Sequence, residues 1–292
     1  MSYLLLPIAI VLALFARTAG AQPVDAAAAL VGGQMRYEVK TGDTLGSIAA
    51  RFGVARASVI EMNTLAAPFA VAAGQTLTID NTHIAVANRA VTITINIPQR
   101  LLVLAEGEHV RAFPVTVGRR TWPTPVGAFT ILSKETDPVW DVPSSIQREM
   151  AQQGKAVITQ MAVSPSNPLG RHWLGLSLPG LGIHGTNAPS SIYAFASHGC
   201  IRMHPEDVAE LFGRVAVTTT GVLFYQPVVV AVIEGRIWVE AHPDEYRRTR
   251  DAAGMVRAVI EREGFAAHTN WDLVEQVLRQ RRGLAVDVTS AP

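Results

Sequence analysis

One short segment, residues 183–203, gathers the groups that most restrict what this chain can be. It reads Ile-His-Gly-Thr-Asn-Ala-Pro-Ser-Ser-Ile-Tyr-Ala-Phe-Ala-Ser-His-Gly-Cys-Ile-Arg-Met and holds the only cysteine of the chain, Cys200. His198 precedes this cysteine by two positions, and His184 lies further upstream. A thiol attacks as the thiolate, and a nearby base favours that form. One thiol and two imidazoles in one segment therefore indicate a nucleophilic site.

Three other interpretations of the segment are open from the residues alone. A lone cysteine is often a small buried hydrophobic residue. A structural zinc site is the second, because the chain offers suitable ligand types, although it has no Cys-x-x-Cys pair: His184, His198, Cys200 and His204. A papain-like peptidase is the third, but such enzymes usually place the cysteine before the histidine. Gly185 and Gly199, each directly after a histidine, favour nucleophilic chemistry because glycine lets the backbone turn sharply beside a substrate.

The segment resembles the signature of the L,D-transpeptidases, the YkuD domain family. The resemblance rests on His-Gly-Thr at 184–186, followed after a spacer by Ser-His-Gly-Cys-Ile-Arg-Met at 197–203. Thr-Pro-Val-Gly at 124–127 resembles the family's Thr-Pro-x-Gly element, and Asn-Pro-Leu-Gly at 167–170 resembles another family loop. The resemblance covers residues 90–226. It implies a β-rich α+β catalytic domain with mixed sheets in a sandwich-like arrangement.

The resemblance also implies a role for each residue of the motif. Cys200 would be the nucleophile and His184 the base that takes its proton, while His198 would line the site. The Gly185 carbonyl would orient the His184 ring. The backbone N–H groups of Gly199 and Cys200 would form an oxyanion hole. Neither a metal nor an organic cofactor is expected.

The candidate substrate-binding residues are Arg202, Ser197 and Thr186. Arg202 has a fixed, forked charge that suits a carboxylate, whereas Ser197 is better suited to holding the loop by hydrogen bonds. The implied reaction uses peptidoglycan tetrapeptide stems: a thioester forms at the third residue and D-alanine leaves. An amine then takes the acyl group, giving a cross-link between two third residues or a covalently attached outer-membrane lipoprotein. An L,D-carboxypeptidase and a non-catalytic cell-wall-binding protein are the alternatives.

Residues 35–80 carry a pattern of their own. An alternating stretch at 37–40 predicts a strand, which a turn-forming Thr-Gly-Asp follows. Asp43 or Thr44 can cap the next predicted helix, which Gly53 ends. A shorter helix and a closing strand complete a β-α-α-β unit.

This unit resembles a LysM module, which binds N-acetylglucosamine chains of peptidoglycan or chitin. The residues that carry the resemblance are Tyr37, Gly42, Asp43, Thr44, Leu45, Ile48, Ala49, Phe52, Asn63, Gly74, Gln75, Leu77 and Ile79. The resemblance places a glycan groove between the loop of Gly42, Asp43 and Thr44 and the loop before Gly74. A purely structural domain is the alternative.

The N-terminus predicts export. Residues 4–15 form a short apolar run, which an Ala-Gly-Ala cleavage-type sequence follows, so residues 1–21 are interpreted as a signal peptide of a periplasmic protein. The run is shorter than the about 20 residues that span a bilayer. Residues 1–4 carry no Lys or Arg, which leaves an uncleaved segment as the alternative. Residues 22–34, rich in Ala and Gly, predict a flexible lead.

Composition restricts the partners. The chain has 292 residues, which suits two small domains, and 49% of them are hydrophobic. Its formal net charge is +1, so a nucleic acid is not expected as a partner. Peptidoglycan, through its glycan strands and stem peptides, is the partner that both resemblances imply.

The rest of the chain predicts mainly strands. Residues 81–91 predict only a brief connection, and alternation at 91–97 predicts a strand with its isoleucines on one face. A helix is expected from Pro205 until Gly213 ends it. Residues 227–292 form a C-terminal extension with a predicted hairpin and two amphipathic helices. Similar extensions occur in the ErfK/YbiS/YcfS/YnhG branch of the family, which also carries LysM modules.

The tryptophans leave two interpretations open. Trp140 lies between Pro138 and Pro143, where it could cover the site or belong to the core. Trp122, Trp173 and Trp238 have the same two interpretations.

Overall fold

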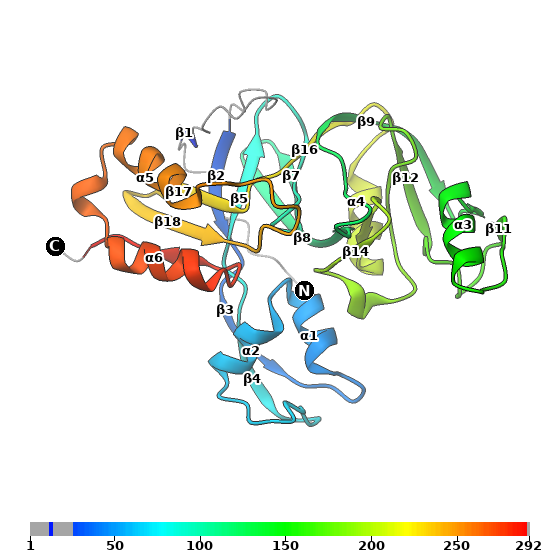
Figure 1. The fold of residues 1–292 in the computed structure, drawn as a ribbon, viewed down its shortest axis with the longest axis horizontal. Coiled ribbons are helices and arrows are strands. Elements are labelled where there is room, and N and C mark those ends of the chain that lie inside the picture. The colour runs from blue at the N-terminus through cyan, green and yellow to red at the C-terminus, as the bar shows by residue number, and fades with distance from the viewer. Residues whose placement is uncertain (1–11, 14–25, 291–292) are drawn as a thin grey trace.

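The computed structural model describes residues 12–13 and 26–290 (Figure 1). In Figure 1 a large β-rich unit occupies the right, a small unit lies below it, and the C-terminal extension lies at the left. The predicted signal peptide, residues 1–21, lies outside the described residues except for β1 (Leu12–Ala13), which pairs with β2 (Ala26–Val31). Among the described residues, no helix is long and apolar enough to cross a membrane.

The large unit is built on one nine-stranded sheet of mixed direction. In spatial order its strands are β14 (Phe195–Ser197), β8 (His109–Gly118), β15 (Ile201–Met203), β13 (Gly182–His184), β12 (His172–Leu176), β9 (Gly127–Thr136), β16 (Thr220–Phe224), β6 (Ile93–Asn96) and β7 (Leu101–Glu106). The long strand β8 also pairs with β7, so the sheet closes on itself. β13–β15, β14–β8 and β16–β6 are parallel pairs, and the other pairs are antiparallel. The predicted β-rich α+β fold with mixed strand directions is confirmed.

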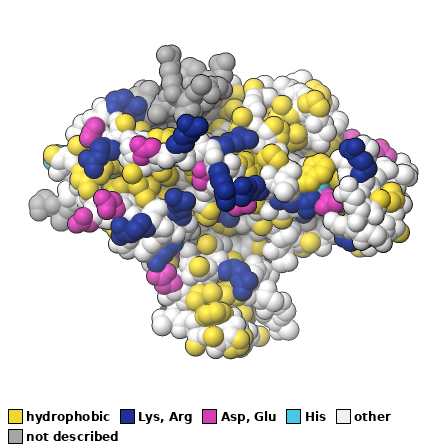
Figure 2. Space-filling model, viewed as in Figure 1, with side chains coloured by type: hydrophobic (Ala, Val, Ile, Leu, Met, Phe, Trp, Pro, Cys, Tyr) yellow, Lys and Arg dark blue, Asp and Glu magenta, His cyan; other side chains and the backbone are white. Residues whose placement is uncertain are grey.

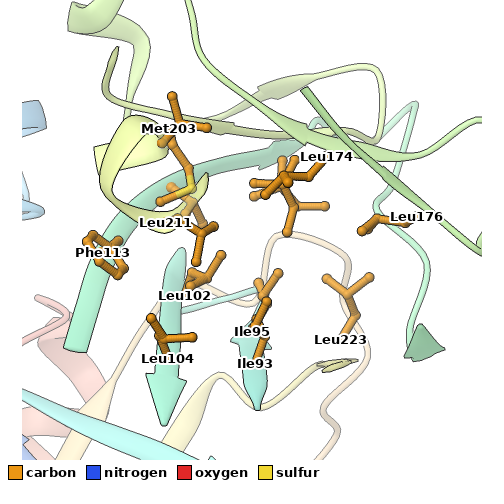
Figure 3. Packing of buried hydrophobic residues seen from close by; sticks show 14 of the residues in the cluster. Ile93, Ile95, Leu102, Leu104, Phe113, Leu174, Leu176, Met203, Leu211 and Leu223 are labelled. Atoms are coloured by element: carbon orange, nitrogen blue, oxygen red, sulfur yellow. The ribbon is translucent and has the colours of Figure 1, made fainter. Parts of the chain in front are cut away.

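The core of this unit follows the predicted alternation of β6. Ile93 and Ile95 point into a cluster with Leu102, Leu104 and Leu223 (Figure 3). The opposite face of β6 is buried as well, under β5 (His83–Asn88). Its polar side chains are satisfied there, because the Thr94 hydroxyl and the Asn96 amide donate to the backbone carbonyls of Val86 and Gln226.

Helix α4 (Pro205–Arg214) covers the sheet with Val208 and Leu211 fully buried. Proline at its first position and two acids in its first turn give the predicted start. The helix passes through Gly213 and ends one residue later, so the predicted stop at that glycine is wrong. Its last turn buries Leu211, and this packing outweighs the low helix propensity of glycine.

Two segments upstream of the large unit correct the sequence analysis. Residues 26–31 are strand β2 rather than part of a flexible lead, and residues 83–88 are strand β5 rather than a brief connection. The two strands pair antiparallel over six positions. Ala27, Ala28 and Ala29 are buried. A run of alanines shows no alternation of polar and apolar residues, so only its distant strand partner reveals its conformation.

The small unit has the predicted β-α-α-β order: β3 (Gln34–Glu38), α1 (Leu45–Phe52), α2 (Arg56–Met62) and β4 (Thr76–Asp80). Thr44 caps α1 and forms a reciprocal capping box with Ser47. Gly53 ends the helix in the left-handed conformation, at φ +68°. Asp43 does not cap the helix, because it accepts hydrogen bonds from the Tyr37 hydroxyl at 2.6 Å and the Lys40 N–H.

Helix α1 of the small unit packs on the large unit at η1 (Pro189–Ser191), inside the segment that joins His184 to Cys200. Ala50 forms a buried apolar cluster with Ile192 and Tyr193. Arg51 lies 3.7 Å from Glu206 at the start of α4. The small unit is therefore docked directly against the motif of the large unit.

The C-terminal extension contains the predicted hairpin, β17 (Val228–Ile233) and β18 (Arg236–Ala241), and the two predicted helices. These are α5 (Ala252–Arg262) and α6 (Trp271–Gln280), and β19 (Ala285–Asp287) adds a third strand. Apolar side chains of both helices and of β18 share one buried cluster.

A fully buried carboxylate joins the C-terminal extension to strand β5 and, through His83, to the small unit. Glu240 on β18 contacts His83 Nδ1 at 2.8 Å and His242 Nε2 at 2.7 Å, and its other oxygen accepts from the Ile84 N–H. His83 Nε2 reaches the Gly53 carbonyl of the small unit at 3.0 Å. Burial opposes charge on each group, but their attraction outweighs it: the pKa of His83 is raised and that of Glu240 is lowered. The junction is therefore an ion pair.

We expect Glu240→Gln to lower the stability by about 3 kcal/mol, because it leaves a buried imidazolium without its counter-ion. The contribution of Glu240 is lost as the pH falls below 4.5, since its folded pKa lies below that value. The contribution of His83 is lost as the pH rises through its folded pKa, which lies above 6.5. The difference from the wild type should therefore be largest between these two values.

Urea unfolding at about pH 5.5 and about pH 8.5 measures this difference. Glu275→Gln is the matched control, because Glu275 is an exposed partner of Arg279 on α6. A Glu240→Gln effect that is the same at both pH values, or no larger than the control, would contradict the ion pair.

Candidate active site

Parallel pairing of β13 and β15 brings the two halves of the motif together. Ile183 lies opposite Ile201 and His184 opposite Arg202, so Cys200 immediately precedes the paired positions. Cross-strand neighbours in register point to the same face of a sheet. Arg202 acts electrostatically on both His184 and Cys200, lowering the pKa of each. The imidazole, the guanidinium and the thiol therefore share one site.

His184 is almost completely buried, with 4% of its surface exposed. Its Nδ1 lies 2.7 Å from the Gly185 carbonyl, and because a carbonyl only accepts, Nδ1 carries the proton and Nε2 is the basic nitrogen of the neutral ring. Trp173 stacks on the ring with centroids 5.7 Å apart. Burial, and then Arg202, lower the pKa of His184 to about 4. The ring is therefore neutral at pH 7.

Cys200 is partly exposed, and its Sγ lies 3.7 Å from the Gly180 carbonyl. Burial raises the pKa of the thiol above its ordinary value, although a backbone hydrogen bond from Gly182 and the charge of Arg202 oppose the shift. In the resting protein both the thiol and the His184 ring are therefore uncharged at neutral pH.

A chain of hydrogen bonds holds the turn that carries Cys200. Ser197 Oγ donates to the Cys200 carbonyl at 2.6 Å and accepts from the Gly199 N–H at 3.1 Å. Thr124 Oγ1 donates to the Gly199 carbonyl at 2.7 Å. Gly199 has φ +112°, a conformation that favours glycine, so this position requires it.

This network bears on three of the predicted roles, and for Ser197 it fits the loop-holding role that the sequence favoured. The Gly199 N–H, a predicted oxyanion donor, is bonded to Ser197 Oγ, which favours the Cys200 N–H as the donor to an oxyanion. Ser197 is fully buried within the turn and serves the loop rather than a substrate. Thr186 is buried as well, and its hydroxyl accepts from the Ala188 N–H. The sequence could not show these bonds, because they depend on the backbone path of the turn.

His198 faces away from this network toward helix α3 (Ser144–Gln152). Its Nε2 lies 2.5 Å from Glu149 Oε2, and the other oxygen of Glu149 accepts from Arg119 Nη2 at 2.6 Å. The edge of Trp122 contacts the His198 ring, with centroids 5.2 Å apart. Trp122 and Trp173 thus both lie against histidines of the motif, whereas the sequence left their positions open.

The zinc alternative finds no support in residues 12–13 and 26–290. No three or more His, Cys, Asp or Glu side chains gather there as they would around a metal ion. His204 Nδ1 instead lies 3.1 Å from Glu206 at the start of α4.

Comparison with known proteins identifies two domains in the chain. The model of the L,D-transpeptidase catalytic domain, YkuD, matches residues 90–230, and the LysM domain model matches residues 37–80. The YkuD protein of Bacillus subtilis, named as an L,D-transpeptidase, is 33% identical over 185 residues, which are 61% of this chain and 91% of that protein. This chain belongs to the YkuD family of L,D-transpeptidases.

Other relatives of this L,D-transpeptidase match nearly its whole length. ErfK/SrfK of Salmonella typhimurium is 28% identical over 273 residues, or 89% of this chain and 88% of the relative. YcfS of Escherichia coli is 28% identical over 293 residues, or 96% of this chain and 91% of the relative. Both are named as L,D-transpeptidases. The predicted likeness to the ErfK/YcfS branch is thus confirmed.

Two residues that sequence reasoning missed brace the nucleophile turn of this L,D-transpeptidase. Tyr246 of the C-terminal extension donates to the Gly118 carbonyl at 2.5 Å and accepts from the Thr124 N–H at 3.1 Å. Thr124 in turn holds the Gly199 carbonyl. Thr124 belongs to the Thr-Pro-Val-Gly element, so its sequence carried a signal. Tyr246 carried none, since no motif links it to the catalytic segment.

Because the thiol is neutral at rest, the alkylation rate of Cys200 by iodoacetamide should keep rising through about pH 9, in parallel with the thiolate fraction. Intact mass spectrometry measures the rate, with glutathione as the reference thiol and Cys200→Ala as the unmodified control. A plateau that begins below about pH 7 would instead show a thiolate–imidazolium pair in the resting enzyme.

Tyr246→Phe should slow acylation of Cys200 by roughly tenfold, because loss of the hydroxyl frees the loop that positions Gly199. Tyr37→Phe is a matched control, since it deletes a hydroxyl bonded to Asp43 in the small unit. Each substitution should cost about 1 kcal/mol of stability, which thermal unfolding measures. Equal acylation rates in the two variants would contradict a positioning role for Tyr246.

Proposed function

We propose that the enzyme transfers the acyl group of a peptidoglycan tetrapeptide stem through a thioester on Cys200. The observation that carries the proposal is the orientation of His184: the Gly185 carbonyl fixes its proton on Nδ1 and leaves Nε2 as a base. The strand register places this ring opposite Arg202, two positions after the thiol. The named L,D-transpeptidase relatives support the same chemistry.

In the first half-reaction, Cys200 Sγ attacks the carbonyl carbon of the third stem residue while His184 Nε2 takes the thiol proton. The Cys200 N–H donates to the oxygen of the tetrahedral intermediate. His184 then gives its proton to the leaving nitrogen, the peptide bond breaks, and D-alanine leaves. Since the thiol and the ring are neutral at rest, proton transfer accompanies attack instead of preceding it.

In the second half-reaction an amine attacks the thioester carbonyl, and His184 Nε2 takes a proton from it. The tetrahedral intermediate collapses, and Cys200 Sγ leaves and recovers a proton. The acceptor is an amine of another stem or a lysine of an outer-membrane lipoprotein. If water attacked the thioester in place of the amine, the enzyme would act as a carboxypeptidase.

Arg202 suits a carboxylate of the donor stem. It is partly buried, and among the described residues no acidic side chain pairs with it. Desolvation of an unpaired cation is costly, so a substrate anion would be a favourable partner. Its charge also lowers the pKa of the Cys200 thiol, although burial outweighs this effect.

The LysM unit would hold the glycan strand. The Asp43 and Thr44 side chains are engaged within their own loop, so glycan contacts there would come from the backbone around Gly42. Figure 2 shows apolar side chains gathered on this unit, whose exposed large hydrophobic residues include Phe69, in the loop before Gly74. A periplasmic location, reached through the predicted signal peptide, fits a peptidoglycan substrate.

Incubation of the enzyme with a tetrapeptide stem, followed by intact mass spectrometry, tests the proposal. We expect an acyl adduct and release of D-alanine, with neither in Cys200→Ala. His184→Gln should slow adduct formation by about 10²–10⁴-fold, because no base takes the thiol proton. Digestion of treated cell-wall material identifies the acceptor. D-alanine release by Cys200→Ala, or an unchanged rate in His184→Gln, would refute these assignments.

A further inference from the structure

The proposed chemistry leaves one charged cluster beside the site unused. We call Glu149, Arg119 and His198 the carboxylate latch. The two oxygens of Glu149 are shared between the other members: Oε1 accepts from Arg119 Nη2 at 2.6 Å, and Oε2 from His198 Nε2 at 2.5 Å. A carboxylate that accepts at both oxygens from cationic or polar N–H donors is a strong pairing. It holds the pKa of Glu149 below its ordinary value, through Arg119 first and then His198.

Arg119 and His198, the two hydrogen-bond donors of the latch, are held rigidly on the catalytic turn. The Arg119 N–H donates to the Ser197 carbonyl at 3.0 Å, and Ser197 directly precedes His198. Trp122 holds the His198 ring from its edge. Arg119 Nε is buried without an acceptor, so the guanidinium has hydrogen-bonding capacity that the protein does not use.

Glu149, the hydrogen-bond acceptor of the latch, lies on helix α3, which is weakly attached to the rest of the protein. Helix α3 has no buried residue and no side-chain cap at its N-terminus. The other side-chain hydrogen bonds of this helix stay local: Gln147 donates to the Val142 carbonyl, and Gln153 donates to Glu149. Among the described residues, only Arg119 and His198 receive or donate side-chain bonds that tie α3 to the catalytic turn. Glu149 can therefore leave its site by giving up its two part-buried contacts, with Arg119 and His198, without opening an apolar core.

We propose that Arg119 and His198 form a binding site for a carboxylate of the donor stem peptide, and that Glu149 fills this site until the donor displaces it. The inference rests on the proposed function and specifies how its substrate is recognised. The site lies on the turn of Cys200, two residues before the nucleophile, whereas Arg202 follows the nucleophile by two residues. Two cationic positions on either side of the thiol suit a donor with two carboxylates.

Two carboxylates of such a donor lie next to the bond that breaks, one on the side chain of its third residue and one on its C-terminal D-alanine. The recognition chemistry is the same for both. Binding tests can separate them with two analogues of the tetrapeptide, one amidated at the side chain of residue three and one at the C-terminus.

Binding is measured by calorimetry in the Cys200→Ala protein, which cannot form an adduct. Adding Arg119→Gln should weaken tetrapeptide binding by about tenfold, because a charged hydrogen bond to the ligand is lost. Adding Glu149→Gln should strengthen it by several-fold, because the competing carboxylate is gone. Arg120→Gln, an exposed neighbour with the same charge change, and Glu275→Gln on α6 are the matched controls.

The carboxylate analogues decide whether the effect is recognition or structure. One of the two analogues should bind the Cys200→Ala protein about tenfold more weakly than the tetrapeptide and should be insensitive to Arg119→Gln. If Arg119→Gln weakens both analogues as much as the tetrapeptide, or if Glu149→Gln leaves binding unchanged or weaker, the inference is wrong. If no tetrapeptide binds even without these changes, the proposed function fails first.

Discussion

Parallel pairing of β13 with β15 is the constraint from which the rest of the site follows. Parallel neighbours cannot be joined by a tight hairpin, so the chain must leave the sheet after His184 and return before Cys200. The connection is short and contains η1 instead of a long helix. Before it returns to β15 it adds β14 to the edge of the sheet beside β8, and His198 follows β14 directly. The same connection is the surface on which helix α1 packs.

Burial shifts the pKa values of the two reacting groups in opposite directions, whereas the charge of Arg202 lowers both. Burial lowers the pKa of His184 and raises that of Cys200, and each shift favours the neutral form. Arg202 lowers both, so it disfavours the imidazolium while it favours the thiolate. A stable ion pair at rest is therefore not the state that this environment supports. Under the proposed mechanism the charge separation arises during the reaction, when a bound donor anion would offset the guanidinium and make the imidazolium less costly.

Features set by nearby residues could be predicted from the sequence. The cap at Thr44, the stop at Gly53 and the hairpin of β17 and β18 each depend on a few consecutive side chains. The Cys200 motif was recognisable for the same reason. Strand β2 could not be predicted, since its alanines become a strand only through pairing with β5. Glu149 and Tyr246 were missed because each comes from a distant segment, and the contacts of one side chain leave no local pattern.

The three parts of the chain meet on one short stretch of backbone. The LysM helix α1 packs on η1, and Tyr246 of the C-terminal extension holds Thr124, which holds Gly199. Glu240 and His83 link the extension to the same small unit through separate contacts, which end at the Gly53 carbonyl. Protein interiors are close-packed and resist gradual deformation. A displacement of the small unit or of the C-terminal extension is therefore transmitted to the connection between His184 and Cys200. The LysM unit and the extension therefore both bear on the position of the nucleophile turn, and the alignment with YcfS, which covers 96% of this chain, extends into all three parts.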